Sequence, residues 1–382
     1  MKFIVDRNIP LVQQAFEGLG DVTALETGDF TKDTVRDADV LVVRSETKVN
    51  AALLDGSCVK FVGTATIGTD HIDLDYLQSR GIGFASAPGS NSNSVKEYVA
   101  AALLHLAARE KYNLKGRTIG VVGVGNVGSK VVKAAEALGL HVVQNDPPLA
   151  ERTGDKHFVG LDDALKCDIV TLHVPLTKEG SHPTFHLIGS EQFAKMKKDS
   201  VFINTSRGAV VDTTALKKAI RDGNVSGSVI DVWEHEPLID CELLYMVSLS
   251  TPHIAGYSTE GKVNAVTAVR KAVCEHFKIK SEWDPHDLIG PPPVPDVKVS
   301  PDEAQPEEIL DLVVSEVYDI TYDNTHLQQL VGMPEKDRAG YFRKLRSGYR
   351  VRREFSNTTV HLPREHAGLS RVLSSLGFKL NV

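Results

Sequence analysis

A glycine-rich turn at residues 123–128 constrains the fold of this chain more than any other feature of the sequence. The turn has the pattern G-x-G-x-x-G, follows a short apolar run at 118–122 and precedes helix-spaced apolar residues between 131 and 138. In such a strand–turn–helix unit the first glycine permits a tight turn, the second lets a pyrophosphate approach the backbone, and the third permits close packing of helix on strand. We therefore predict that a dinucleotide is held by Gly123, Gly125, Asn126, Val127 and Gly128.

An acidic residue indicates which dinucleotide binds. Asp146 lies 18 residues after Gly128, at the end of the next strand pattern. A carboxylate there accepts hydrogen bonds from ribose hydroxyls and repels a 2′-phosphate, which favours NAD over NADP. The alternative is a glycine turn in a flavodoxin-like domain, with Asp146 as a surface acid.

Strand patterns alternate with helix patterns along most of the chain, which predicts an α/β fold with doubly wound parallel sheets. The first strand patterns lie at residues 3–5, 40–43 and 61–63, and a long alanine-rich helix follows at about 93–109. A second series of strand patterns lies at residues 118–122, 141–143, 168–172, 201–204, 228–231 and 247–249. This second series is long enough to complete a nucleotide-binding domain by itself.

A proline-rich segment at 291–295 predicts a linker, since proline cannot continue a helix or sit inside a sheet. The C-terminal region that follows has eight acids and no base between residues 302 and 323, and seven bases and no acid between residues 338 and 353. Either the basic run binds an anionic group such as a phosphate, or it forms internal ion pairs with the acidic stretch.

Composition excludes several classes of function. The formal net charge of −7 argues against general nucleic-acid binding, which needs a basic face. The longest apolar stretch, residues 98–108, is about half of a membrane span, so we expect no membrane association. The four cysteines have no Cys-x-x-Cys spacing, and we expect reduced thiols, no metal site and a cytoplasmic location.

Three polar residues follow three strand patterns of the nucleotide-binding region. Arg207, Glu236 and His253 could meet at one ligand, because the carboxyl ends of parallel strands lie at one edge of a sheet. A guanidinium holds a carboxylate by two hydrogen bonds, and an imidazole takes a hydroxyl proton while hydride leaves the same carbon. A carboxylate beside the imidazole stabilises its protonated form. This set suits the oxidation of a 2-hydroxy acid.

The chain resembles the D-isomer-specific 2-hydroxyacid dehydrogenases. The resemblance is carried by the glycine turn with Asp146, by N-T-S-R-G-A-V-V at 204–211, by D-V-W-E-H-E-P at 231–237 and by T-P-H-I-A-G at 251–256. It implies that Arg207 binds the substrate carboxylate, that Glu236 is the partner of the histidine and that His253 is the acid/base.

The resemblance also implies a division into domains. Residues 94–256 would be a Rossmann NAD-binding domain inserted into a flavodoxin-like substrate domain formed by residues 1–93 and 257–285. Residues 286–382 would be a small α+β domain through which the protein forms a homodimer.

Some segments are similar to the members of this family that act on a phosphorylated four-carbon 2-hydroxy acid. These segments are V-R-S at 43–45, F-V-G-T-A-T-I-G-T-D-H at 61–71, S-A-P-G at 86–89 and I-A-G-Y-S at 254–258. By this resemblance Ser45, Thr66 and Tyr257 contact the substrate, and Thr205, Ser206, Asp231 and Gly256 line the nicotinamide side. Arg44, beside Ser45, is a candidate cation for the phosphate. Val174 departs from the pattern, because relatives are expected to carry threonine there.

Two alternatives remain open at this level. One is another dehydrogenase of the same family, acting on 3-phosphoglycerate or glycerate. The other is a protein that binds NAD as a sensor, like the transcriptional corepressors of this fold.

Overall fold

The computed structural model describes residues 1–280, 282–301 and 304–381. The chain divides into two compact units, and each is described by itself. Unit 1 consists of Met1–Asn91 and Ser258–Pro291, and unit 2 of Ser92–Tyr257 and Pro292–Val382. The C-terminal region therefore shares a unit with the nucleotide-binding region.

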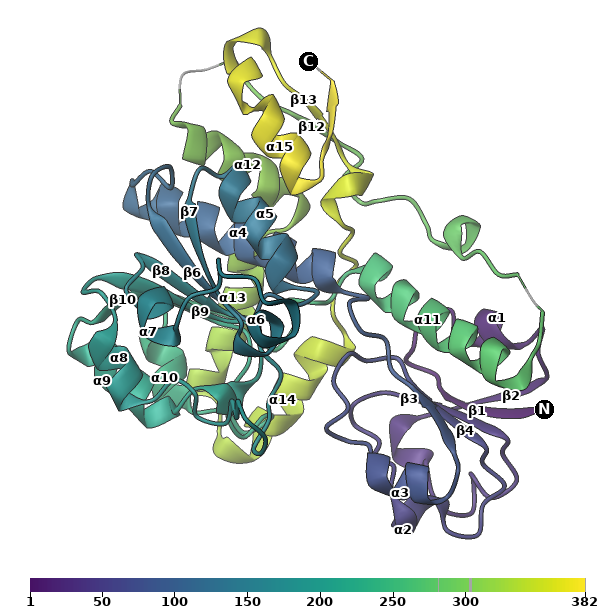
Figure 1. Cartoon of the computed structure of the whole chain (residues 1–382). Helices are drawn as coiled ribbons and strands as arrows, with labels where there is room; N and C mark the ends of the chain where they lie inside the picture. Colours follow the sequence, from purple (N-terminus) through teal and green to yellow (C-terminus); the bar gives the residue numbers. More distant parts are fainter. Residues whose placement is uncertain (281, 302–303, 382) are drawn as a thin grey trace. The chain divides into compact units, whose positions relative to one another are not determined.

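Unit 1 is built on a five-stranded parallel sheet with the order β2-β1-β3-β4-β5, which is the flavodoxin-like order (Figure 1). Helices α1 and α11 cover one face, and the short helices α2 and α3 cover the other. The strands are β1 (Lys2–Asp6), β2 (Asp21–Leu25), β3 (Val40–Val43), β4 (Phe61–Thr64) and β5 (Gly83–Ala85). The helices are α1 (Val12–Phe16), α2 (Ala51–Leu54), α3 (Leu74–Ser79) and α11 (Thr259–Phe277).

Side chains of β3 alternate between the two faces of this sheet, as the two-residue period of a strand requires. Val40 and Val42 pack with α1 and α11, whereas Leu41 and Val43 pack with the opposite helices. Both faces are therefore apolar, which explains the continuous apolar run of this strand. The sequence patterns missed β2 and β5, the two edge strands, because none of their residues is buried and they do not form such a run.

Unit 2 contains a six-stranded parallel sheet with the order β11-β10-β9-β8-β6-β7. Its strands are β6 (Thr118–Val122), β7 (His141–Asn145), β8 (Ile169–Leu172), β9 (Ser200–Asn204), β10 (Val225–Ile230) and β11 (Leu249–Ser250). Val159 adds one further rung beside β7, since its N–H donates to Gln144 O at 2.9 Å. With this rung counted as the third strand, the order is the 3-2-1-4-5-6 of a Rossmann domain, as predicted, with β11 added as a seventh strand beside β10.

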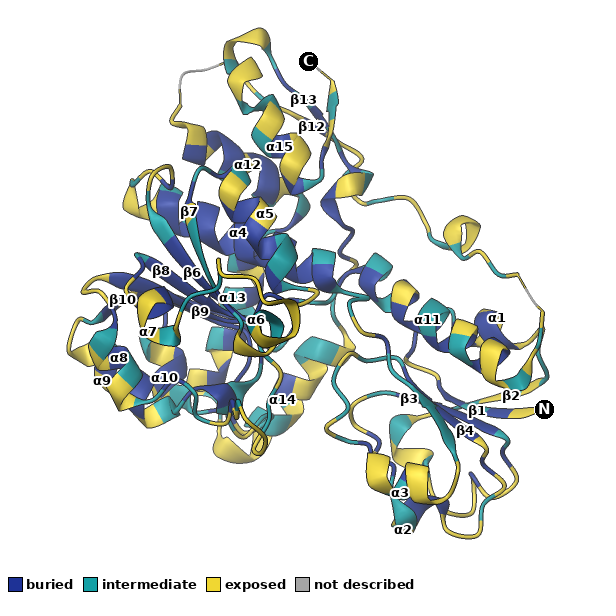
Figure 2. Ribbon diagram, in the orientation of Figure 1, coloured by how far each residue is buried: buried dark blue, intermediate teal, exposed yellow. Residues whose placement is uncertain are grey.

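Helices cover both faces of this sheet, and the strands between them are buried except for the edge strand β7, which is mostly half-buried (Figure 2). One face packs on α4 (Ser92–Glu110) and α5 (Gly128–Ala137). The opposite face packs on α7 (Leu161–Leu165), α8 (Ser190–Lys195), α9 (Thr213–Arg221) and α10 (Cys241–Met246), while α6 (Pro147–Thr153) follows β7. The long predicted helix is α4, which is buried along most of its length.

The C-terminal region packs onto this nucleotide-binding sheet and its helices. Helix α12 (Pro306–Val317) contacts α4, α13 (Ile320–Gln328) contacts β11, and α15 (Ser370–Leu376) contacts α5. Helix α14 (Glu335–Ser347) and a small parallel sheet, β12 (Asp296–Lys298), β13 (Thr359–His361) and β14 (Lys379–Asn381), complete the region. In the described part of the chain, no helix is long and apolar enough to cross a membrane.

Candidate active site

The glycine turn lies between β6 and α5, at the point where the strand order of the sheet reverses. Gly123 has a φ of +87°, a left-handed conformation that favours glycine. A Cβ on Gly128 would lie 1.9 Å from Gly123 O, so the third glycine permits the close packing of helix on turn. A Cβ on Gly125 would meet no described atom within 4 Å. This open space above the second glycine is where the pyrophosphate of a dinucleotide fits.

The remaining residues of the turn lie where the sequence pattern predicts. Asn126 is exposed, and Val127 is the N-cap of α5. Val174 follows β8, and a Cβ on Gly123 would approach its Cγ1 at 2.8 Å. The side chain of Val174 therefore lies against the turn, where it offers an apolar contact in place of the expected threonine hydroxyl.

Asp146 directly follows the strand β7 and connects the glycine turn to the next helix through hydrogen bonds. Its Oδ2 accepts a hydrogen bond from Val124 N at 2.8 Å, and its Oδ1 accepts one from Leu149 N at 2.9 Å as the N-cap of α6. A carboxylate has about four lone-pair sites, so both oxygens can still accept from ribose hydroxyls. Together with the open space at Gly125, this carboxylate fits NAD.

Glu236 and His253, predicted from loops 17 residues apart, are in direct contact. His253 Nδ1 lies 2.8 Å from Glu236 Oε2, and Glu236 Oε1 accepts from Trp233 N at 2.8 Å. Burial acts to raise the pKa of Glu236, but the charge and hydrogen bond of His253, the Trp233 N–H and the charge of Arg346 outweigh it and lower the pKa. An ionised Glu236 orients the imidazole so that Nε2 is left for a proton transfer.

Asp231, predicted on the nicotinamide side, anchors the loop that carries His253. Its Oδ1 accepts from Thr251 Oγ1 at 2.6 Å and from Ile254 N at 2.7 Å, and its Oδ2 accepts from Ala255 N at 3.0 Å. Burial raises the pKa of this carboxyl, while His253 and these hydrogen bonds act in the opposite direction. Sequence reasoning missed this structural role, because the hydrogen bonds cross between two loops.

The loop of Arg207 packs directly on the loop of Glu236. A Cβ on Gly208 would lie 1.9 Å from the carbonyl carbon of Trp233, so only glycine permits this approach. Arg207 Nη1 donates to Ser206 O at 2.8 Å, and Ser206 donates from its N and Oγ to the Asn204 side chain. The three loops follow the neighbouring strands β9, β10 and β11.

His173 joins Thr205 to the strand β8. Its Nδ1 lies 3.1 Å from Thr205 Oγ1, and its Nε2 lies 3.0 Å from Thr171 Oγ1. Burial lowers the pKa of His173 to about 3, so the ring is neutral at ordinary pH. A neutral imidazole donates through one nitrogen and accepts through the other, which fixes both threonine hydroxyls.

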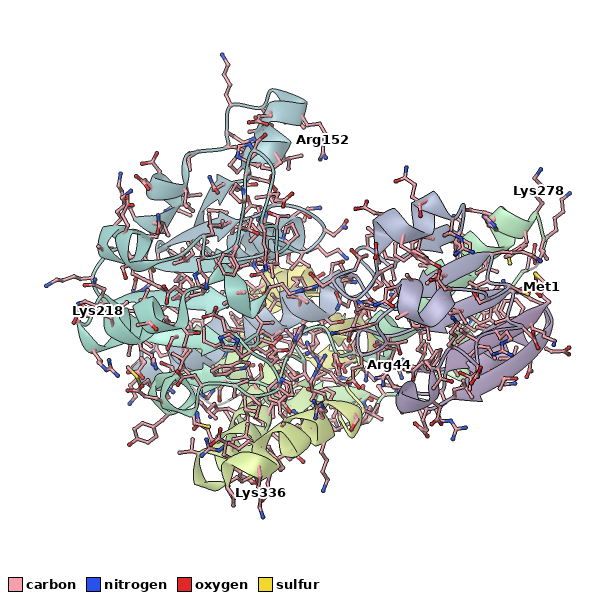
Figure 3. All side chains as sticks on the ribbon, turned by 90° about the horizontal axis from the view of Figure 1, so that it is seen from below. Met1, Arg44, Arg152, Lys218, Lys278 and Lys336 are labelled. Atoms are coloured by element: carbon pink, nitrogen blue, oxygen red, sulfur yellow. The ribbon has the colours of Figure 1, made fainter. Side chains whose placement is uncertain are left out.

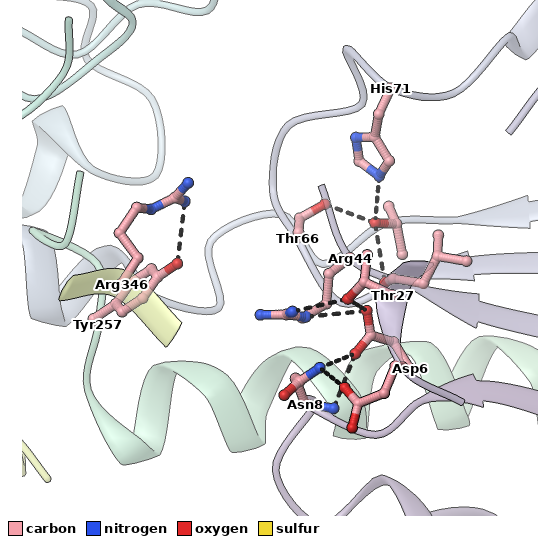
Figure 4. A network of polar contacts seen from close by, with 11 residues as sticks. Asp6, Asn8, Thr27, Arg44, Thr66, His71, Tyr257 and Arg346 are labelled. Atoms are coloured by element: carbon pink, nitrogen blue, oxygen red, sulfur yellow. Dashed lines mark hydrogen bonds and ion pairs between the residues drawn. The ribbon is translucent and has the colours of Figure 1, made fainter. Parts of the chain in front are cut away.

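The C-terminal region contacts the segment that carries this site through Arg346 and Asn324, two residues that the sequence patterns did not single out. Tyr257, which follows Gly256, accepts a hydrogen bond at its hydroxyl from Arg346 Nη2 at 3.1 Å (Figure 4). Asn324 Oδ1 accepts from both Ser250 N and Ser250 Oγ at 2.8 Å, directly before the loop of His253. No periodic signal joins residues so distant in sequence.

Unit 1 holds the other predicted substrate residues at the carboxyl ends of its strands. Arg44 Nε lies 3.2 Å from Oδ2 of the fully buried Asp6, and Arg44 Nη2 donates to Thr27 Oγ1 at 3.2 Å (Figure 4). Thr66 Oγ1 donates to Gly68 O at 2.8 Å, and Ser45 is exposed. Asp6 and Thr27 thus orient the cation that the sequence singled out.

The basic run of the C-terminal region is largely committed to internal contacts. Arg350 lies 3.7 Å from Asp323, and Arg352 is only 3% exposed. By contrast, the side chains of Lys218 and Lys336, which lie outside the basic run, project from the ribbon (Figure 3). The acidic stretch also includes residues 302 and 303, which lie outside the described residues. Among the described residues, no group of three or more His, Cys, Asp or Glu could hold a metal ion.

Comparison with known proteins defines the class. Residues 92–255 match the family described as D-isomer specific 2-hydroxyacid dehydrogenase, NAD binding domain, and residues 288–377 match a domain of unknown function, DUF3410. D-lactate dehydrogenase from Aquifex aeolicus, solved with NAD and lactic acid, is 29% identical with a TM-score of 0.62, over 73% of this chain and 96% of that chain. NAD⁺-bound 3-phosphoglycerate dehydrogenase from Entamoeba histolytica is 25% identical with a TM-score of 0.63, over 74% and 98%. The fold and site are those of an NAD-dependent 2-hydroxyacid dehydrogenase.

Curated relatives match the full length of the chain. Erythronate-4-phosphate dehydrogenase of Chromohalobacter salexigens is 42% identical over 386 residues, covering 100% of this chain and 99% of that protein. The enzyme of that name from Azotobacter vinelandii is 42% identical over 379 residues, covering 99% of each. The chain belongs to the erythronate-4-phosphate dehydrogenase family.

Proposed function

We propose that the protein oxidises 4-phospho-D-erythronate to 2-oxo-3-hydroxy-4-phosphobutanoate with NAD, as a step of pyridoxal 5′-phosphate (vitamin B6) biosynthesis. The observation that carries the proposal is the 2.8 Å contact between Glu236 and His253 in the NAD-binding unit. The names of the full-length relatives support the choice of substrate.

The residues of this unit divide the chemistry between them. Arg207 binds the substrate carboxylate and stabilises the negative charge that develops on the carbonyl oxygen. Glu236 holds Nδ1–H of His253, and Nε2 accepts the proton of the C2 hydroxyl as the C2–H bond breaks. NAD, when bound, supplies the acceptor for the hydride. Thr205, Ser206, Asp231 and Gly256 shape the wall on the nicotinamide side.

We assign substrate contacts to Ser45, Thr66, Tyr257 and Arg44. The fixed geometry of Arg44, held by Asp6, supports a role in binding an anionic group. Ser45→Ala and Thr66→Val should raise KM for the phosphorylated acid while leaving the affinity for NAD unchanged.

A panel of 2-hydroxy acids tests the proposal. NADH absorbance should report the highest kcat/KM for 4-phospho-D-erythronate, with lower values for D-erythronate, D-glycerate and 3-phosphoglycerate. A preference for 3-phosphoglycerate or glycerate would support the alternative dehydrogenase. NAD binding without turnover of any of these acids would support a sensor.

We also propose that residues 286–382 mediate a homodimer and that the protein acts in the cytoplasm. Val351 and Leu312, both in this region, expose 65% and 50% of their surface, and these are the positions that we assign to the interface. The four cysteine thiols are free, as in a reducing compartment.

A further inference from the structure

The arginines of the basic run have different environments. Arg352 is buried, donates to Ser94 O at 2.7 Å and to Ala255 O at 3.2 Å, and stacks 3.8 Å from the centroid of the Tyr318 ring. Arg350 donates to Asp319 O at 2.6 Å and lies beside the Asp323 carboxylate. These two side chains hold the C-terminal region together and onto the nucleotide-binding domain, so they are poorly placed to receive a ligand.

Arg346 differs, because it extends toward the active-site loop. It lies in the last turn of α14, and its Nη2 donates a hydrogen bond to the Tyr257 hydroxyl (Figure 4). Tyr257 is four residues after His253. The charge of Arg346 is also the smallest of the contributions that lower the pKa of Glu236, which places the guanidinium on the side of the Glu236–His253 pair.

The proposed substrate needs such a cation. Its carboxylate is at one end of a four-carbon chain and its phosphate is at the other, so the arginine that binds the carboxylate cannot also bind the phosphate. A guanidinium binds phosphate by paired, charge-assisted hydrogen bonds. The carbonyl end of α14 stabilises a positive charge in its last turn.

We propose that Arg346, oriented by the Tyr257 hydroxyl, binds the phosphate group and makes the enzyme specific for phosphorylated 2-hydroxy acids. This inference rests on the proposed function. It gives the C-terminal region a role in substrate recognition in addition to the proposed role in dimerisation.

The test compares Arg346→Gln with wild type on 4-phospho-D-erythronate and on D-erythronate, which lacks the phosphate. We expect kcat/KM for the phosphorylated acid to fall roughly 10–10²-fold, as when a charged hydrogen-bonding partner is removed. The value for D-erythronate should stay within about threefold. Arg346→Lys should recover part of the loss, because the charge remains while the paired geometry is lost. Arg343→Gln, an exposed position on the same helix, is the matched control and should leave both values unchanged.

Two results would overturn the inference. Equal losses on both acids, accompanied by a shifted pH–rate profile, would mean that Arg346 acts through Glu236 and His253. An unchanged kcat/KM for the phosphorylated acid would mean that Arg346 binds no phosphate. NAD affinity and thermal unfolding of each variant separate these results from misfolding, and wild-type activity on 4-phospho-D-erythronate tests the proposed function separately.

Discussion

Glu97 is an acid inside the core of the nucleotide-binding unit. It lies on α4 with 2% of its surface exposed, and its Oε1 accepts from Phe355 N at 3.0 Å. Among the described residues, Oε2 has no hydrogen-bond partner. Burial raises its pKa to about 8, with repulsion from Glu354 acting in the same direction and Lys96 and Arg352 opposing it.

This raised pKa predicts that stability falls as the pH rises from about 4.5 to 8. In that interval the unfolded chain has lost the Glu97 proton while the folded protein retains it, so deprotonation favours unfolding. Glu97→Gln stays neutral and keeps the acceptor for Phe355 N. Its melting temperature should therefore decline less between pH 6 and pH 8.5 than that of wild type, as followed by circular dichroism.

The exposed Glu136→Gln is the control for this measurement and should follow the wild-type curve. Parallel curves for wild type and Glu97→Gln would show that Glu97 is already ionised in the folded protein.

Glu236 and His253 give a second prediction at the scale of residues. His253→Ala should lower kcat by about 10²–10⁴, the usual contribution of a positioned acid/base. Because Glu236 acts through the imidazole, the double variant with Glu236→Gln should lose little more than His253→Ala alone. Steady-state kinetics with NADH absorbance gives kcat for His253→Ala, for Glu236→Gln and for the double variant. Additive losses would mean that Glu236 has an independent role.

The glycine turn and α5 act as one element, and two of its glycines serve different purposes. Gly125 faces open space, whereas Gly128 faces the backbone of Gly123 at a distance that a methyl group cannot share. Gly125 therefore leaves space for the ligand, whereas Gly128 permits the close packing of α5 on the turn.

Gly125→Ala should raise the Kd for NAD roughly tenfold, which corresponds to about 1.4 kcal/mol, and leave the melting temperature nearly unchanged. Gly128→Ala should cost about 1–3 kcal/mol of stability, because the added methyl group overpacks the turn. Fluorescence titration with NAD and thermal unfolding separate the two effects. A loss of stability in Gly125→Ala equal to that in Gly128→Ala would contradict this division.

At the scale of the whole molecule, the C-terminal region contacts the segment that carries the site. Its helices contact α4, α5 and β11, and Asn324 and Arg346 reach the segment that carries His253 and Tyr257. Removing a region attached in this way would expose the buried face of α4. The proposed role of the region in dimerisation is therefore best tested by substituting residues on its surface.

We predict a solution mass of about twice 41.6 kDa by sedimentation equilibrium. Replacing Leu312 and Val351 together by Asp should yield monomers, because charged groups are costly to bury in an interface. Tyr245→Asp, at a position 77% exposed on α10, is the control and should stay dimeric. A wild-type mass of 41.6 kDa would reject the homodimer.

The sequence alone was sufficient for much of the fold and for one contact of the site. Strand β6, the long helix α4 and the glycine turn follow from local periodicity and from the conformational freedom of glycine. The meeting of Glu236 with His253 could be anticipated because parallel strands end at one edge of their sheet.

Only the tertiary structure decided how the basic run is used and what supports the catalytic loop. The bond from Arg346 to Tyr257 spans 89 positions, and the bonds from Asn324 to Ser250 span 74. Periodicity reports which face of an element is buried, but it carries no information about which distant element covers that face. For the same reason, local charge density could not distinguish a buried Arg352 from an arginine that extends toward the active-site loop.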